Sequence, residues 1–220
     1  RRLLGELVMK NANADKYFTD AEKEKIRNAT RDIETRTIGE VAVVVVDSSD
    51  PYPDAEVVGG VLLGSLLSFV VTVSFFHASL WSYIPLSFLC FFPLRYLVKK
   101  IPAVKAAFIG VHRKNHAVEE MAIRLFYEKG LYKTRKSTGV LFFLSLLERK
   151  VRVLADLGIH EKIGQETLDT FARTVSQGIK EGRSCDALCG AMQDAGALIA
   201  KHFPLTPGDT NELPDDVITG

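Results

Sequence analysis

Three side chains could do metal or proton chemistry, and each follows a segment that predicts a β-strand. Asp47 comes directly after the apolar run EVAVVVV (40–46), while Asp156 and His160 follow an alternating segment that ends at Ala155. Ligands of α/β proteins bind at the ends of strands, so these side chains could meet at one edge of a sheet. Carboxylates suit Ca²⁺ or Mg²⁺, and a histidine can position or deprotonate a water molecule. We therefore take Asp156 and His160 as candidate catalytic residues, and Asp47 and Asp156 as candidate ligands of Ca²⁺ or Mg²⁺.

A structural interpretation of the same residues stays open: Asp156 would cap a loop and His160 would begin a solvated helix. The sequence contains no glycine-rich phosphate loop and no GxSxG or HExxH motif. Its three cysteines, Cys90, Cys185 and Cys189, lack the spacing of a zinc site. The 28 Lys and Arg residues nearly balance the 27 Asp and Glu residues, so we expect no nucleic-acid partner.

A long uncharged stretch interrupts an otherwise ordinary soluble sequence. No Asp, Glu, Lys or Arg occurs from Val57 to Leu94, a length of about 57 Å as one helix. A bilayer core about 30 Å thick needs only about 20 residues, so the stretch predicts two crossings. Trp81 and Tyr83, which favour the membrane interface, lie near the expected break. We expect a transmembrane hairpin over 57–98, with helices at about 57–76 and 80–98. A buried hairpin of a soluble core, or one crossing with a re-entrant segment, is the alternative.

The charges that flank this hairpin predict its orientation. Basic residues follow the second helix, and the tip carries none, which places both flanks in the cytoplasm by the positive-inside rule. We therefore expect a two-helix protein of the cytoplasmic (inner) membrane. The basic collar, which could contact anionic lipid, consists of Arg95, Lys99, Lys100 and Lys105.

A row of small residues in the first apolar helix predicts close helix packing. Gly60, Gly64 and Ser68 recur every four residues, a spacing that lets two helix backbones approach. We expect the row to pack against the second helix rather than to form a dimer.

The flanking segments, 1–56 and 99–220, predict a single α/β domain. Thr19 and Glu22 form a capping box at the start of a helix that Gly39 would end. Strands are expected at 40–46, 140–147 and 150–155, and a polar turn at Glu148-Arg149 would join the last two. Further helices are expected at about 105–130, 161–180 and 185–202. Glu40, Glu148 and Arg149 would be solvated strand ends, and the tail from about 204 would be extended.

One lone strand in the first segment needs the strands of the second, so the two segments would share a small mixed sheet covered by helices. The first two strands should then be parallel, joined by a right-handed crossover. Both segments must lie on one face of the membrane, which requires an even number of crossings.

Several phrases of the sequence resemble a known family. FTDAEKEKI, TRTIGEVAVVVV, TRKSTGVLFFLSLLERKVRVLAD, the Gly158-Ile159 pair and NELPD, spread over about 17–216, are similar to the TPM domain family. The closest resemblance is to a bacterial subgroup that carries a membrane hairpin inside the domain. The resemblance implies a TPM-like α/β fold. It also implies either an acid-phosphatase-like activity with divalent cations at an acidic cleft, or a role as an accessory factor.

The acidic positions of the family are only partly present. Many members have Asp-Asn-Gly where this chain has Ser137-Thr138-Gly139, and Gly-Tyr-Gly-Leu-Glu where it has Asp156 to His160. We therefore expect a non-catalytic, membrane-anchored interaction or accessory domain at the cytoplasmic face. Its partners would be membrane lipid and other envelope proteins, including LemA-like helical ones. The alternatives are a divalent-cation-dependent, phosphatase-like hydrolase and a domain that recognises anionic lipid headgroups.

Overall fold

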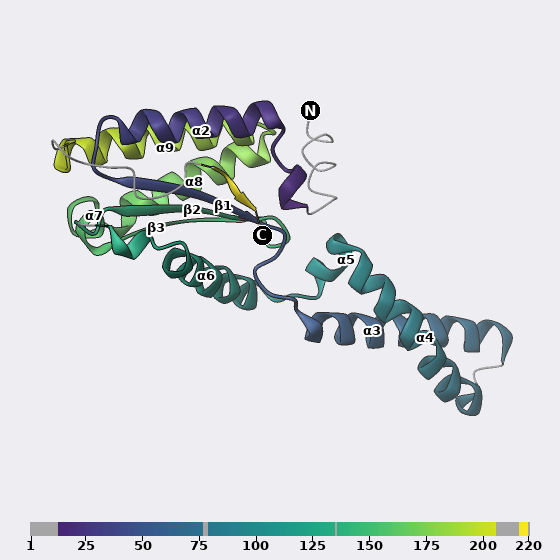
Figure 1. The fold of residues 1–220 in the computed structure, drawn as a ribbon. Coiled ribbons are helices and arrows are strands. Elements are labelled where there is room, and N and C mark those ends of the chain that lie inside the picture. The colour runs from purple at the N-terminus through teal and green to yellow at the C-terminus, as the bar shows by residue number, and fades with distance from the viewer. Residues whose placement is uncertain (1–12, 77–78, 135, 206–215, 220) are drawn as a thin grey trace. The chain divides into compact units, whose positions relative to one another are not determined.

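The computed structural model describes residues 13–76, 79–134, 136–205 and 216–219 (Figure 1). The chain divides into an α/β unit, formed by Arg1–Ser49 with Asn115–Gly220, and a hairpin unit, Asp50–Lys114. Each unit is described separately below.

A four-stranded mixed sheet organises the α/β unit. Its strands are β1 (Glu40–Val46), β2 (Gly139–Ser145), β3 (Lys150–Ala155) and β4 (Ile218–Thr219), in the order β3-β2-β1-β4. β1 and β2 are parallel and pair from Glu40 with Gly139 to Val46 with Ser145, whereas β3 returns antiparallel to β2. The predicted small mixed sheet is therefore confirmed. β4, which pairs with Val44 and Val45, is an addition that the sequence did not predict.

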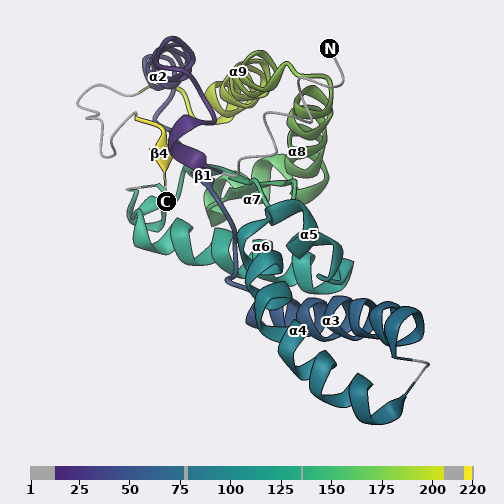
Figure 2. The ribbon, with the colours of Figure 1, turned by 90° about the vertical axis from the view of Figure 1, so that its right-hand side faces the viewer.

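Helices cover both faces of this sheet (Figures 1 and 2). One face packs against α2 (Asp20–Glu34), α8 (Gln165–Lys180) and α9 (Ser184–His202), and the other against α6 (Val111–Glu128). Alternate residues of β1 enter the two cores: Val41, Val43 and Val45 enter one, and Ala42, Val44 and Val46 the other. Burial on both faces explains why β1 is a continuous apolar run instead of an alternating one.

Several predicted boundaries change for identifiable reasons. The capping box is confirmed, because Glu22 accepts from the Thr19 amide at 2.9 Å and its own amide donates to Thr19 Oγ1 at 3.3 Å. The α2 helix ends at Glu34, however, and not at Gly39. Gly39 serves close packing instead, because a Cβ there would lie 2.7 Å from the Ile199 side chain.

Three other predicted elements are broken or shortened. The expected helix at 105–130 is two helices, α5 (Pro102–Ala107) and α6, followed by the short turn η2 (Leu131–Lys133). The expected helix at 161–180 is α7 (Leu157–Ile163) and α8, separated at Gly164, whose φ of +76° suits glycine. β2 ends at Ser145 because a turn over 146–149 begins earlier than predicted.

The hairpin unit contains α3 (Pro53–Phe75) and α4 (Leu80–Lys100), which are long and apolar enough to span a membrane, with mean hydropathies of 2.2 and 1.2. The row of small residues packs against α4 as predicted. A Cβ on Gly60 would lie 2.8 Å from the Arg95 Cβ, and one on Gly64 would lie 3.3 Å from the Phe91 Cα. Close backbone approach is therefore what these glycines provide.

We expect Gly64→Leu to force α3 and α4 apart and to destabilise the hairpin by roughly 1–3 kcal/mol, the usual cost of overpacking. Thermal unfolding in detergent, followed by circular dichroism, measures the effect as a lower melting temperature. Val61→Leu is the control, because Val61 is exposed on the same helix. Equal melting temperatures for the two variants would show that the small-residue row is not a packing interface.

Candidate functional site

The first candidate ligand, Asp47, follows β1 at the carboxyl end of the parallel strands. Its side chain is exposed, and its carboxylate accepts a hydrogen bond from the backbone amide of Ala14. Ala14 begins the short 3₁₀ turn η1 (Ala14–Lys16). Asp47 therefore holds the chain that precedes α2 against the end of the sheet.

The second candidate pair, Asp156 and His160, lies at the start of α7. Asp156 is the N-cap of that helix and accepts from the Leu157 amide at 2.8 Å, while His160 is exposed one turn later. The other carboxylate oxygen of Asp156 is buried and has no hydrogen-bond partner among the described residues. Asp156 is thus a capping residue that retains one unused oxygen.

Strand direction separates these two sets of residues. Ser145, at the end of β2, pairs with the first residue of β3, and Val140 pairs with Ala155, which precedes Asp156. Asp47 and Asp156 therefore lie at opposite ends of the sheet, about 20 Å apart at roughly 3.3 Å per residue. The sequence hypothesis placed them at one edge, and the antiparallel return of β3 explains why they are not. Within the described ranges, no group of three or more His, Cys, Asp or Glu side chains could hold a metal ion.

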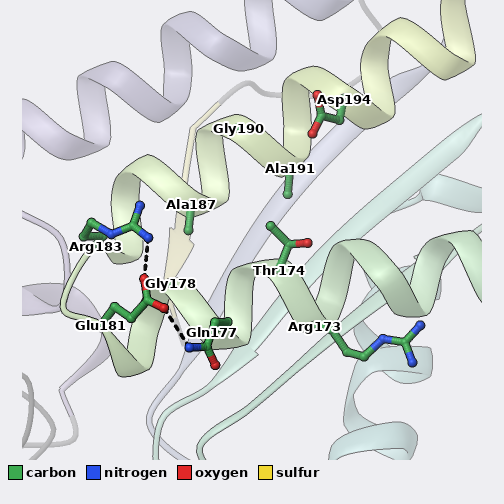
Figure 3. A pocket seen from close by; sticks show the side chains of 10 residues that line it. All are labelled: Arg173, Thr174, Gln177, Gly178, Glu181, Arg183, Ala187, Gly190, Ala191 and Asp194. Carbon is green, nitrogen blue, oxygen red and sulfur yellow. Dashed lines mark hydrogen bonds and ion pairs between the residues drawn. The ribbon is translucent and has the colours of Figure 1, made fainter.

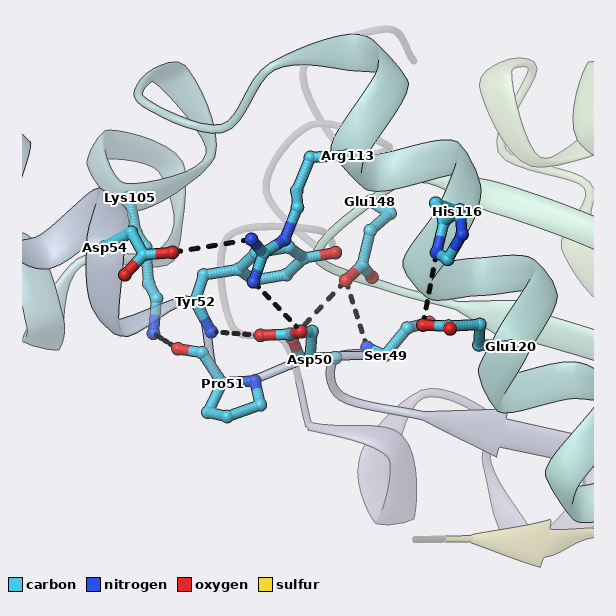
Figure 4. Close-up of polar contacts among 11 residues, drawn as sticks. Ser49, Asp50, Pro51, Tyr52, Asp54, Lys105, Arg113, His116, Glu120 and Glu148 are labelled. Carbon is cyan, nitrogen blue, oxygen red and sulfur yellow. Dashed lines mark hydrogen bonds and ion pairs between the residues drawn. The ribbon is translucent and has the colours of Figure 1, made fainter.

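A buried glutamate at the carboxyl end of β1 and β2 was not predicted as a functional residue. Glu148 is only 6% exposed, so its interpretation as a solvated strand end is wrong, as it is for Glu40 at 5%. Glu148 accepts from the Ser49 amide at 3.0 Å (Figure 4). It also accepts from Ser48 Oγ at 3.4 Å and from the Ser145 hydroxyl. The signal available in the sequence was Ser145, a polar residue that interrupts the apolar run of 140–147.

These contacts let Glu148 join the segment after β1 to the turn after β2. Hydrogen bonds to a charged group contribute more than neutral ones, and leaving their donors unsatisfied in a buried position is costly. Ser145 is itself 2% exposed, so its hydroxyl is not accessible to a substrate. The serine–glutamate cluster therefore stabilises the ends of the two parallel strands.

An open groove of about 470 Å³ lies along α8 and α9 (Figure 3). Its floor contains small residues, including Gly178, Gly190 and Ala191, and charged or polar side chains line its sides. At one end, Glu181 accepts from Gln177 at 2.7 Å and from Arg183. The Gln177 hydrogen bond, and then the Arg183 guanidinium, hold the pKa of Glu181 below its ordinary value. Figure 3 shows Arg173 and Asp194 away from this paired end.

Three of the four collar residues lie where the sequence placed them, exposed at the end of α4: Arg95, Lys99 and Lys100. Lys105 does not join them. Its ammonium pairs with Glu56 at 2.9 Å, with both side chains largely buried, and it also donates to the Pro51 carbonyl (Figure 4). Lys105 therefore fixes the base of the hairpin unit instead of presenting its charge to lipid.

The same base contains a second basic residue, Arg113. Its guanidinium lies 3.4 Å from the carboxylates of Asp50 and Asp54 and 5.9 Å from the centre of the Tyr52 ring. Tyr52 is buried in a left-handed conformation (φ 46°), and Asp50 accepts from its amide at 2.6 Å. These contacts fix the chain as it enters α3.

Residues 104–198 match the family model of the TPM domain. These residues, a little under half of the chain, are similar to a TPM domain. The resemblance drawn from the sequence is thereby confirmed. The matched residues include Glu148, Asp156 and nearly all of the groove-forming helices α8 and α9. β1 and the α3–α4 hairpin precede the matched residues.

A solved structure supports the same fold. The NMR structure of the BA42 protein from the psychrophilic bacterium Bizionia argentinensis has a TM-score of 0.58 and 19% sequence identity, over 92% of this chain and 95% of BA42. At this identity the likeness concerns the fold alone. Comparison with curated proteins gave no match.

The positions of the acidic residues predict how the α/β unit responds to divalent cations. Because Asp47 and Asp156 lie far apart, we expect millimolar Ca²⁺ or Mg²⁺ to leave the melting temperature of the protein unchanged. A ligand at 100 times its dissociation constant would add about 2.7 kcal/mol, which is easily detected. A shift that Asp156→Asn abolishes would contradict this expectation, and Asp47→Asn is the matched control at the opposite end of the sheet.

Proposed function

We propose that the protein is a membrane-anchored interaction domain, in which the α3–α4 hairpin crosses the cytoplasmic membrane twice and the TPM domain binds other envelope proteins. The exposure of large apolar side chains along the hairpin is the observation that carries this proposal. Phe75 is 76% exposed, Leu80 70% and Trp81 89%. Contiguous apolar surface of this kind marks a membrane or protein contact, whereas a helix of a soluble core would bury it.

The position of charge supports a cytoplasmic location for the TPM domain. Arg95, Lys99 and Lys100 follow the apolar part of α4, and the described tip residues carry no Lys or Arg. The positive-inside rule then places both ends of the hairpin on the cytoplasmic side. The basic side chains can extend toward the headgroups while their stems remain in the apolar region.

The groove along α8 and α9 supports the interaction role. A Cβ at Gly190 would meet nothing within 4 Å, so folding does not require glycine at this position. Glycine inside a helix costs about 1 kcal/mol relative to alanine. The small side chains leave room for the backbone of a partner helix to approach, and Arg173 and Asp194 offer charges of both signs. A helical envelope protein of the LemA-like kind would suit such a groove.

A phosphatase-like hydrolase is the second candidate, and one observation favours it. One carboxylate oxygen of Asp156 is buried and has no hydrogen-bond partner in the part of the chain that the structure describes, so it is an available ligand for a hard cation. Anionic-lipid recognition by the collar is a third candidate, now resting on Arg95, Lys99 and Lys100. We prefer the interaction role because the groove offers both space and exposed polar side chains. The hydrolase is less well supported, because its two candidate metal ligands, Asp47 and Asp156, lie far apart.

The single tryptophan of the sequence tests the membrane anchor directly. Trp81 begins α4 and should lie near the bilayer interface, so lipids brominated or spin-labelled close to the headgroup should quench its fluorescence strongly. Lipids labelled at the acyl-chain ends should quench it less. Fluorescence of the full chain reconstituted in vesicles gives the measurement. Protection from both kinds of lipid would show that α4 is not inserted.

The groove is tested by filling it. We expect Gly190→Leu to abolish co-purification of a stoichiometric partner after cross-linking in native membranes, without lowering the melting temperature, because the added side chain meets open space. Ala197→Leu is the control, since Ala197 is exposed on the same helix but does not line the groove. Equal partner recovery with the two variants would exclude the groove as the binding surface.

A further inference from the structure

A short 3₁₀ turn, η2, follows α6 and presents polar and aromatic side chains outward. Leu131 of η2 is fully buried in the core formed by β1, β2 and α6. A Cβ on Gly139 would lie 2.3 Å from the Leu131 carbonyl oxygen, so η2 contacts the start of β2 directly. With Leu131 held inward, its neighbours Tyr132 and Lys133 are exposed.

Two tyrosines form the aromatic part of this surface. Tyr127, in the last turns of α6, is 58% exposed, and Tyr132 is 44% exposed. Their ring centres lie 5.2 Å apart. Ile123, one helical turn before Tyr127, is also 44% exposed and extends the apolar area. Exposed aromatic rings with polar hydroxyl ends favour a boundary between apolar and aqueous surroundings.

Three lysines give this surface a positive charge. Lys133 and Lys136 are exposed and Lys129 is partly exposed, and none of them forms an ion pair among the described residues. Lys136 lies in a turn in which Thr134 Oγ1 accepts from the Thr138 amide at 2.8 Å and the Thr134 carbonyl accepts from Ser137. Glu128, an acidic residue beside Lys129, lies 4.0 Å from Arg124.

We propose that this tyrosine–lysine patch, formed by Tyr127, Lys129, Tyr132, Lys133 and Lys136, binds the surface of an anionic bilayer. Tyrosine rings favour the headgroup region, and each lysine near an anionic surface improves binding about fivefold. Three lysines together give an effect on the order of 100-fold. The patch belongs to the α/β unit and is separate from the collar at the end of α4.

A bilayer is favoured over an acidic protein because the chain itself supplies a tether. The inference rests on the proposed membrane anchor, which would hold the α/β unit close to a lipid surface and raise the effective lipid concentration. Weak individual contacts are then sufficient to dock the patch. Salt screens charge attraction of this kind but not purely apolar contact, so the salt dependence of binding distinguishes the two.

A tryptophan placed in the patch tests the proposal with the full chain. The Trp81→Phe, Tyr132→Trp protein is reconstituted in phosphatidylcholine vesicles with or without about 30% phosphatidylserine, each containing a headgroup spin label. We expect quenching of the new tryptophan to be several-fold stronger with phosphatidylserine and to fall at 0.5 M NaCl. Adding Lys129→Gln, Lys133→Gln and Lys136→Gln should reduce the quenching to the level of phosphatidylcholine alone. If the reporter variant does not fold, Tyr127→Trp provides the same measurement.

A matched control removes the same charge elsewhere. Lys162→Gln, Lys180→Gln and Lys201→Gln change three exposed lysines outside the patch, and should leave the quenching unchanged. The proposal would be overturned by equal quenching in both kinds of vesicle or by equal effects of the two triple variants. Binding of an acidic protein to the patch without any lipid dependence would overturn it as well. Trp81 in the unaltered chain reports on the anchor separately. If Trp81 is quenched and the patch reporter is not, the anchor stands and the patch proposal fails.

Discussion

The parallel pairing of β1 with β2 is the constraint on which the rest of the structure depends. β1 is buried on both faces and pairs along its whole length with a strand that lies almost one hundred residues later. Such a strand cannot be stable alone, because its apolar residues need a core on each face and its backbone groups need partners on each edge. Everything between β1 and β2 must therefore leave the sheet and return to it.

This constraint gives the inserted hairpin its form. In the proposed membrane anchor, an even number of crossings would return the chain to its side of departure, and α3 and α4 form one pair of helices packed through small residues. At the base of the hairpin unit, the Lys105–Glu56 pair and the contacts of Arg113 fix the two ends of the insertion. At the ends of β1 and β2, Glu148 fixes the sheet. The largely buried charges among these, Glu148 in the α/β unit and the Lys105–Glu56 pair in the hairpin unit, are all paired or hydrogen-bonded, as burial requires.

Residue patterns in the sequence were sufficient to predict most of the fold, but they predicted little of the candidate site. The β1 bounds, the capping box and the parallel pairing follow from local residue types and from one topological argument. β4 has only two residues and lacks a periodic signal, so its position depends on tertiary pairing with β1. The burial of Glu148 depends on donors from Ser48 and Ser49, which lie about a hundred residues away in sequence. Asp47 and Asp156 looked alike in sequence because both follow strands, and only the direction of β3 separates them.

The distance along the chain between β1 and β2 also has a consequence for biogenesis. During synthesis, β1 is complete long before its partner strand exists, and its uncharged part, VAVVVV (41–46), is rich in β-branched residues and prone to aggregate while unpaired. Closing the sheet early would require ordering a loop of nearly a hundred residues, which carries an entropic cost. Insertion of the hairpin during translation would bring the two ends of that loop together beforehand. The order of events would then be membrane insertion first and sheet closure second, with nascent β1 depending on chaperones in the interval.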